Sequence, residues 1–171
     1  ATRQMFGNNK PKWTGGLSTT ISFYNFELSA LAGFSAGFKV YDYAGPTNWS
    51  DDGYSSTYIH ERKLLDSWTP DNTSSDNPLL LQGIKNGSNH SSRYLHNGNT
   101  LRLKNLKLAY NIPTKVCQSI GAKGINVYVQ GENLFLWNEL GFDPEVSTSG
   151  GRYHYTWATQ RTYIFGLNFK L

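Results

Sequence analysis

Four histidines and two acidic stretches are the residues of this chain whose types could bind a metal ion. The histidines are far apart and match no spacing of metal ligands, which favours solvated loop residues. They are His60, His90, His96 and His154. Asp51-Asp52-Gly53 and the segment 71–76 could supply oxygen ligands to Ca²⁺, but turn formation explains them better. We therefore predict no metal site.

The single cysteine, Cys117, is the only thiol available for nucleophilic chemistry. It excludes a disulfide within the chain and every zinc pattern that needs several cysteines. The sequence has no Gly-x-Ser-x-Gly elbow, no phosphate-binding glycine loop and no Cys–His pair in a supporting pattern. We predict an inert thiol in a turn, no enzymatic activity and no cofactor.

Aromatic side chains in the polar segments are the remaining candidates for binding. Tyrosine and tryptophan rings stack on sugars and bury well against protein partners. The candidates for contact with a substrate or with a covering protein are Trp49, Tyr54, Tyr58, Trp68 and Tyr94. The same rings could instead pack the segment 41–92 on itself, and both alternatives stay open at this point.

The overall composition excludes several classes of protein. Charged residues make up 16% of the chain and aromatic residues 15%, and the formal net charge is +4. Lysine and arginine are not concentrated in any stretch, so we expect no nucleic-acid partner. No apolar run is long enough for a membrane-spanning helix. A membrane-spanning β-strand alternates apolar and polar residues, however, so the mean hydropathy of −0.51 does not exclude a transmembrane β-barrel.

The strongest periodic signal covers residues 26–40. Apolar side chains occupy the even positions, and small or polar ones the odd positions except Leu31. This period of two predicts a β-strand, and its length exceeds the usual 5–6 residues or so of soluble strands. A strand that crosses a membrane needs about 9–11 residues. The lipid-facing candidates here are Phe26, Leu28, Ala30, Ala32 and Phe34.

Four further segments are predicted to be strands. They lie near 14–24, 99–112 and 125–137, and from about 157 to the final residue. A tight turn at Tyr24-Asn25 joins the first two strands, because asparagine tolerates positive φ. The alternation slips at Lys104-Asn105, which predicts a β-bulge. In the last strand the lipid-facing candidates are Phe165, Leu167 and Phe169.

The connections between these strands alternate in length. Short links at 24–25 and 113–124 contrast with long polar loops at 41–92 and 138–156, and 55–68 could form a short helix. Short turns on one side and long extracellular loops on the other are typical of outer-membrane barrels. Five antiparallel strands leave two open edges, which cannot face lipid. We therefore predict an all-β chain of antiparallel membrane-spanning strands that is part of a larger barrel.

Five segments of the chain resemble the SusC/RagA family of TonB-dependent outer-membrane transporters. They follow the order of the family and together cover nearly the whole chain. They are 8–17 (NNKPKWTGGL), 101–113 (LRLKNLKLAYNIP), 127–135 (VYVQGENLF), 141–146 (GFDPEV) and 161–169 (RTYIFGLNF). The resemblance identifies residues 1–171 as the C-terminal part, about five strands, of such a transporter.

The resemblance implies a barrel of about 22 strands in the Gram-negative outer membrane, with an N-terminal plug. Such a protein imports oligosaccharides or peptides, is energised through TonB, and works with a SusD-like surface lipoprotein as its lid. The expected partners are therefore outer-membrane lipid, the remainder of the barrel and plug, the lid, and TonB through a part of the protein outside this sequence. Transport belongs to that assembly rather than to these residues alone.

Two other interpretations remain open. One is a soluble β-sandwich that binds carbohydrate through its exposed aromatic rings, against which the long alternating strand counts. The other is a separately encoded barrel piece that pairs with a partner chain. Its strands would obey the same physics as those of the transporter, so the sequence does not distinguish the two.

Overall fold

The computed structural model describes residues 4–45, 62–80, 90–146 and 151–171, without the side chain of Lys63. The chain divides into two compact units. We call 11–37, 98–143 and 158–171 the sheet unit, and 1–10, 38–97 and 144–157 the loop unit. Among the residues described, no helix is both long and apolar enough to cross a membrane.

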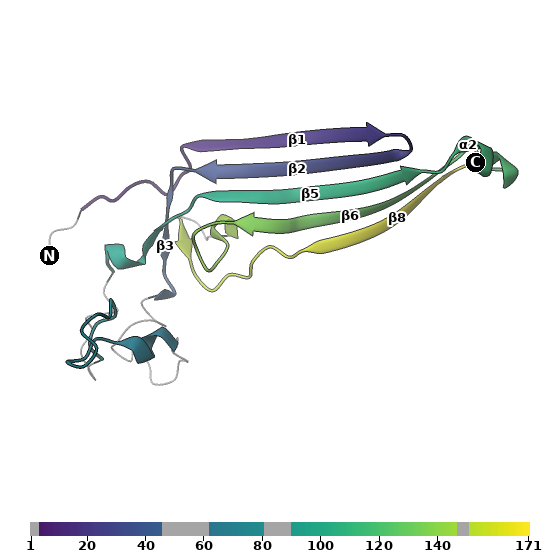
Figure 1. The fold of residues 1–171 in the computed structure, drawn as a ribbon. Helices are drawn as coiled ribbons and strands as arrows, with labels where there is room; N and C mark the ends of the chain where they lie inside the picture. The colour runs from purple at the N-terminus through teal and green to yellow at the C-terminus, as the bar shows by residue number, and fades with distance from the viewer. Residues whose placement is uncertain (1–3, 46–61, 81–89, 147–150) are drawn as a thin grey trace. The chain divides into compact units, whose positions relative to one another are not determined.

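Five long strands form the sheet unit (Figure 1). They are β1 (Trp13–Phe23), β2 (Phe26–Ala36), β5 (Thr100–Asn111), β6 (Gly124–Trp137) and β8 (Thr162–Lys170). All neighbours are antiparallel, in the order β1-β2-β5-β6-β8. The prediction of five antiparallel strands is confirmed. The described strands form an open sheet, in which β1 and β8 are the edges.

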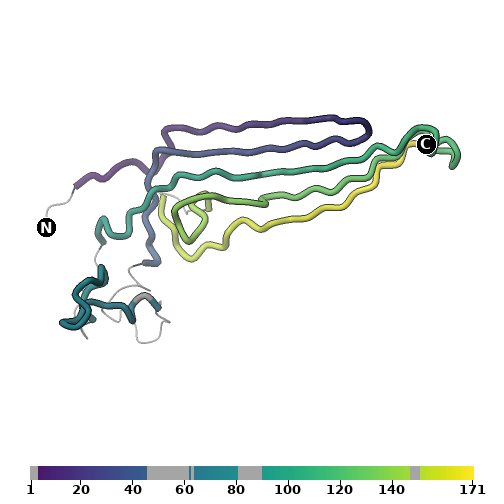
Figure 2. The backbone as a smooth tube through the Cα atoms, viewed as in Figure 1, coloured from purple at the N-terminus to yellow at the C-terminus, as the bar shows by residue number. Residues whose placement is uncertain are grey.

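The two short connections lie at one end of this sheet, together with the C-terminus (Figure 2). The β1–β2 turn is as short as predicted, but the residue with positive φ is Tyr24, at 50°, rather than Asn25. The second connection is not a plain turn, because it contains the helix α2 (Thr114–Ser119). Cys117 lies in α2 and is fully buried, with Sγ 3.5 Å from the Ile112 carbonyl oxygen.

Two predicted strand boundaries are wrong. The strand expected over 26–40 ends at Ala36, because Gly37 adopts a left-handed φ of 78°. The Gly37 N–H donates to Oδ1 of Asn99 at 2.8 Å, which fixes the break. The alternation beyond it belongs to a separate strand, β3 (Lys39–Asp42), in the loop unit. The last strand begins at Thr162 rather than near Trp157.

The β-bulge predicted at Lys104-Asn105 is confirmed by the pairing of β5 with β2. Ala32 pairs with Leu103 and Ala30 with Leu106, so β5 contains one extra residue at this point. Cross-strand partners share a face of the sheet. The extra residue therefore returns the leucines on both sides of the bulge to one face, although their sequence positions change from odd to even.

One face of the sheet is apolar across all five strands. The registers put on this face Trp13, Leu17, Ile21, Phe23, Phe26, Leu28, Ala30, Ala32, Phe34, Leu101, Leu103, Leu106, Leu108, Tyr110, Ile125, Val127, Val129, Phe135, Trp137, Tyr163, Phe165, Leu167 and Phe169. Thr19, Gly15 and Gly131 interrupt it. Many of its side chains are exposed, including Phe165 at 81% and Leu17 at 72%. We call this surface the apolar face.

The opposite face is polar. The registers put on it Thr14, Ser18, Thr20, Ser22, Glu27, Ser29, Ser35, Arg102, Lys107, Asn111, Asn126, Tyr128, Gln130, Glu132, Thr162 and Asn168. Leu31 and Ile164, the exceptions to the two sequence alternations, also lie here. The Lys107 ammonium lies 4.4 Å from the centroid of the Tyr128 ring. A sheet with one apolar and one polar face needs two different environments.

The loop unit contains a second, smaller sheet in the order β4-β3-β7. Its strands are β3, β4 (Leu95–Asn97) and β7 (Arg152–Tyr153), and β3 pairs with β7 in parallel. Three 3-10 helices, η1 (Arg62–Asp66), η2 (Ser92–Tyr94) and η3 (Pro144–Val146), complete its described regular structure. Of the helix predicted over 55–68, the described part is 62–68, and there the structure has the 3-10 helix η1, which ends at Asp66. The segments predicted as loops therefore carry structure of their own.

Candidate functional site

A buried ion pair lies at the end of the sheet unit opposite the short connections. Nη2 of Arg102 donates to Oδ2 of Asp143 at 2.6 Å, and the two side chains are 4% and 1% exposed. Arg102 belongs to β5, a strand paired on both sides. Asp143 follows β6 in the segment GFDPEV. Because both charges are removed from water, the pair is held by its mutual attraction and its hydrogen bonds.

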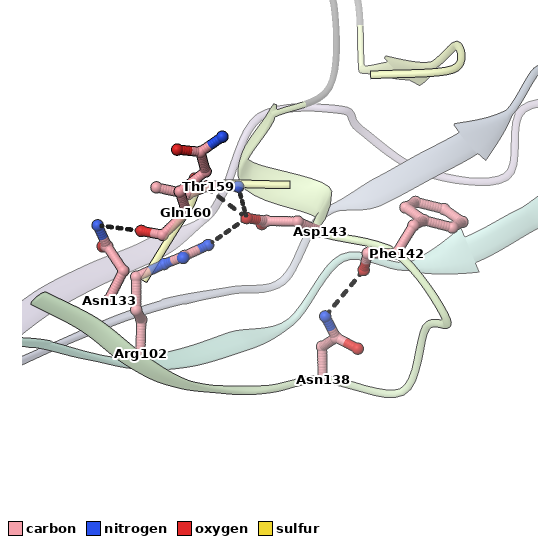
Figure 3. A network of polar contacts seen from close by, with 7 residues as sticks. All are labelled: Arg102, Asn133, Asn138, Phe142, Asp143, Thr159 and Gln160. Carbon is pink, nitrogen blue, oxygen red and sulfur yellow. Dashed lines mark hydrogen bonds and ion pairs between the residues drawn. The ribbon is translucent and has the colours of Figure 1, made fainter. Parts of the chain in front are cut away.

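The same carboxylate oxygen also binds the segment that leads into β8 (Figure 3). Oδ2 of Asp143 accepts from the Thr159 hydroxyl at 3.3 Å and from the Thr159 N–H at 3.5 Å. One buried oxygen therefore joins β5, the end of the 138–143 turn and the approach to β8. We call Arg102, Asp143 and Thr159 the clamp.

Two asparagines hold the chain on either side of the clamp. Oδ1 of Asn138 accepts from the Leu140 N–H at 2.8 Å, and its Nδ2 donates to the Phe142 carbonyl at 3.0 Å. These bonds close the turn that carries Asp143. Asn133 adopts a φ of 53°, which asparagine tolerates, and its Nδ2 donates to the Gln160 carbonyl at 3.3 Å (Figure 3). The two asparagines therefore hold the turn before Asp143 and the residue after Thr159 in place by hydrogen bonds.

The loop unit is built around a tyrosine. Tyr94 is 0% exposed, and its ring centroid lies 6.4 Å from that of Tyr41. The Tyr41 hydroxyl lies 2.9 Å from Nδ1 of His90, so the two side chains share a hydrogen bond. Burial, reinforced by the nearby Tyr94, raises the pKa of Tyr41 to about 12. Burial and the charge of Asp42 likewise raise the pKa of Tyr153.

Beside this core, four rings from three separate segments form a continuous exposed strip. The Tyr43 ring lies 5.7 Å from His90 and 5.2 Å from His154, and His154 lies 5.2 Å from Tyr155. We call these four residues the ring strip. All four are exposed, with Tyr43 at 36% and Tyr155 at 52%. Rings presented in this way are suited to contact with a ligand or a partner.

The raised pKa of Tyr41 gives a pH dependence that can be measured. Folding favours the neutral phenol, so the stability that it contributes is present below the pKa of an unfolded tyrosine, near 10.0, and is lost as the pH rises through about 12. We expect the difference between the phenolate absorbance titrations of wild type and Tyr41→Phe to centre near pH 12. A difference centred near pH 10 would contradict the raised pKa of this hydroxyl.

The five aromatic residues expected to contact a substrate or lid fall into two groups. Trp49, Tyr54 and Tyr58 lie outside the described residues. Trp68 is 38% exposed, whereas Tyr94 is fully buried and packs the loop unit. A buried ring offers no face to a ligand. In this structure Tyr94 therefore packs the segment 41–92 on itself, which is the second of the two alternatives given for these rings.

Sequence reasoning missed both the clamp and the ring strip. The histidines were interpreted as scattered, yet the structure brings His90 and His154 to the same tyrosine ring. His60 lies outside the described residues, as do Asp51 and Asp52. Within the part of the chain that the structure describes, no three acidic, histidine or cysteine side chains gather as metal ligands would.

Comparisons with known proteins give the chain its class. No protein-family model matches it. It is 29% identical over 174 residues to TonB-dependent receptor P26 of Formosa agariphila, and 27% identical over 187 residues to TonB-dependent receptor P3 of the same organism. These alignments cover 96% and 99% of this chain but 17% of each relative. The chain thus spans about a sixth of the length of the curated relatives it matches.

A solved structure extends the similarity to the fold. The RagAB peptide importer in its closed-closed state matches with a TM-score of 0.85 and 26% identity, over 98% of this chain and 18% of that one. By sequence and by fold, the chain is homologous to TonB-dependent receptors along nearly all of its length. Among them it resembles the RagA/SusC-like transporters, and its open sheet matches part of the RagA barrel. Proteins of this class lie in the outer membrane and are generally not enzymes.

Proposed function

We propose that this chain is the C-terminal part of an outer-membrane transporter that imports oligosaccharides or peptides. Uptake would be energised through TonB, and a SusD-like surface lipoprotein would act as the lid. The observation that carries the proposal is the two-faced sheet, which matches part of the RagA barrel. The homology covers a small share of the relatives, so the activity belongs to the complete protein.

The apolar face is the surface that we assign to lipid. Eleven residues at about 3.3 Å each make a strand of about 36 Å, which at a tilt of about 45° spans roughly 25 Å, the height of the apolar band of an outer-membrane barrel. In water, an apolar surface across five strands would be an aggregation site. The residues assigned to lipid from the sequence all lie on it, namely Phe26, Leu28, Ala30, Ala32, Phe34, Phe165, Leu167 and Phe169.

The edges of the sheet require further strands. In the described residues β1 pairs only with β2, and β8 only with β6. Backbone groups that face hydrocarbon without partners cost several kcal/mol each. We therefore assign the remaining strands of one barrel to these edges, with the polar face toward the plug-filled interior. A soluble sandwich would instead need a second sheet over the apolar face.

We assign contacts with the substrate or the lid to the loop unit. Trp68 is the described candidate with an exposed ring, and Trp49, Tyr54 and Tyr58 are candidates outside the described residues. The long polar segments of an outer-membrane barrel lie on the extracellular side, where a lid would bind. An aromatic ring there can stack on a sugar or bury against a protein.

Uptake assays test the proposal directly. We would compare cells with and without the gene, and supply fluorescein-labelled casein peptides or fluorescein-labelled starch oligosaccharides. We expect gene-dependent accumulation of one of the two probes, abolished by a protonophore, because transport through TonB draws on the inner-membrane proton gradient. Accumulation that survives the protonophore would contradict energised import. Equal uptake with and without the gene would contradict any role in uptake of these probes.

The denatured mass of the native polypeptide separates the structural alternatives. A chain far heavier than 19.2 kDa in an outer-membrane extract supports the transporter. A 19.2 kDa chain held in a larger membrane particle would mean a separately encoded barrel piece. The same chain found only in the soluble fraction would contradict the assignment to the membrane.

A further inference from the structure

The two residues that flank the segment 144–157 are joined through one carboxylate oxygen. Asp143 directly precedes this segment, and Thr159 follows it by two residues. Oδ2 of Asp143 accepts both the hydroxyl and the N–H of Thr159. The clamp therefore joins Asp143 to Thr159 and makes the segment between them a closed loop.

The atom that closes this loop is itself firmly held. Arg102 binds it at 2.6 Å, from a strand that is paired on both sides. The Asp143 side chain is 1% exposed, so water cannot take the place of the arginine if the pair separates. A buried charge that loses its partner is strongly destabilised. Asp143 and Thr159 are thus attached to strand β5 rather than to another loop.

The segment supplies two of the four residues of the ring strip. Its strand β7 pairs with β3 through Tyr41 and Arg152, and His154 and Tyr155 belong to the ring strip. Where a short segment begins and ends limits the positions that its middle can reach. Breaking the contact between Asp143 and Thr159 would therefore change the positions that His154 and Tyr155 adopt beside Tyr43.

We propose that Asp143 is a positioning residue for uptake. It joins the two residues that flank 144–157, itself and Thr159, and thereby restrains the part of the ring strip that this segment supplies to a ligand. The link to uptake rests on the proposed transport function, whereas the holding of the segment does not. Asp143 touches no substrate in this account, since it acts through the segment that it anchors.

Two variants test the clamp in the full-length protein in lipid nanodiscs. Thr159→Val removes the hydroxyl contact and keeps the ion pair, and Asp143→Asn removes the charge and keeps the shape. We expect amide hydrogen exchange in 144–146 and 151–161 to rise at least about tenfold in both variants, with the β1–β2 hairpin unchanged. Thr162→Val, the same change at an exposed position three residues further on, is the matched control and should exchange like wild type.

Uptake of the probe identified above then tests the link to the ligand. We expect the half-saturating probe concentration to rise severalfold in Thr159→Val, while the maximum rate and the amount of folded protein in the outer membrane stay at the wild-type level. Unchanged exchange in both variants would overturn the proposal. Faster exchange with an unchanged half-saturating concentration would overturn the link to uptake. Absence of energised uptake in wild type would contradict the proposed transport function, and the exchange experiment would still decide whether the clamp holds the segment.

Discussion

Replacing Thr19 with arginine is expected to lower the stability of the proposed membrane barrel by about 2–4 kcal/mol, whereas the same replacement at Thr20 is expected to be tolerated. Thr19 pairs with Ala30 on the apolar face near the middle of β1, and Thr20 pairs with Ser29 on the polar face. An arginine at position 19 would place its charge near the bilayer midplane, where nothing solvates it. At position 20 it would reach the polar interior.

The two threonines form a matched pair, since the residue, the substitution and the strand are the same. The measurement is chemical unfolding of the full-length protein in lipid vesicles, with the heat-modifiable band on an unheated gel as the sign of folding. The expected difference corresponds to about two orders of magnitude in the folding equilibrium. If Thr20→Arg is as damaging as Thr19→Arg, the two faces of the sheet do not meet different environments.

The second large effect concerns the buried ion pair. Arg102→Met removes the partner of a carboxylate that is 1% exposed, and breaking a buried pair in this way costs about 3–5 kcal/mol. The methionine fills much of the space but cannot donate a hydrogen bond. We therefore expect a large loss in unfolding free energy, measured in the same vesicle assay.

A double variant distinguishes the loss of the pair from the loss of arginine packing. Arg102→Met with Asp143→Leu removes both buried charges of this pair, so we expect it to be more stable than Arg102→Met alone. Arg161→Met is the control for the removal of an exposed arginine in the same unit and should lie within about 0.5 kcal/mol of wild type. A single Arg102→Met variant as stable as that control would show that the ion pair contributes little.

The strands and the bulge could be predicted because their signals are local. Each strand carries its own alternation, and the slip at Lys104 is visible within 99–112 without knowledge of any neighbour. The break at Gly37 could not be predicted in the same way, because the apolar alternation continues through Phe38 and Val40 in a different sheet. A continuous pattern predicts extended chain but does not say which sheet each part joins.

The candidate site was beyond prediction for a related reason. Arg102 and Asp143 are 41 residues apart, and neither occurs in a pattern that suggests a partner. His154 comes beside Tyr43 because β7, directly before it, pairs in parallel with β3, although 98–143 separates the two strands in the sequence. His90 reaches the same ring from a different segment of the chain. The helix α2 is short and buries only Cys117, so it leaves no amphipathic period to detect.

The interleaving of the two units in the sequence has a consequence for how such loops can be exchanged between relatives. The loop unit is encoded by three stretches, and β5 and β6 lie between the second and the third. A recombination event with one crossover inside 98–143 would pair β3 from one parent with β7 from the other. Chimeras that transfer the loop unit intact must therefore graft 38–97 and 144–157 together. During synthesis, β7 emerges only after β5 and β6, so the nascent chain cannot complete the small sheet before those two strands are made.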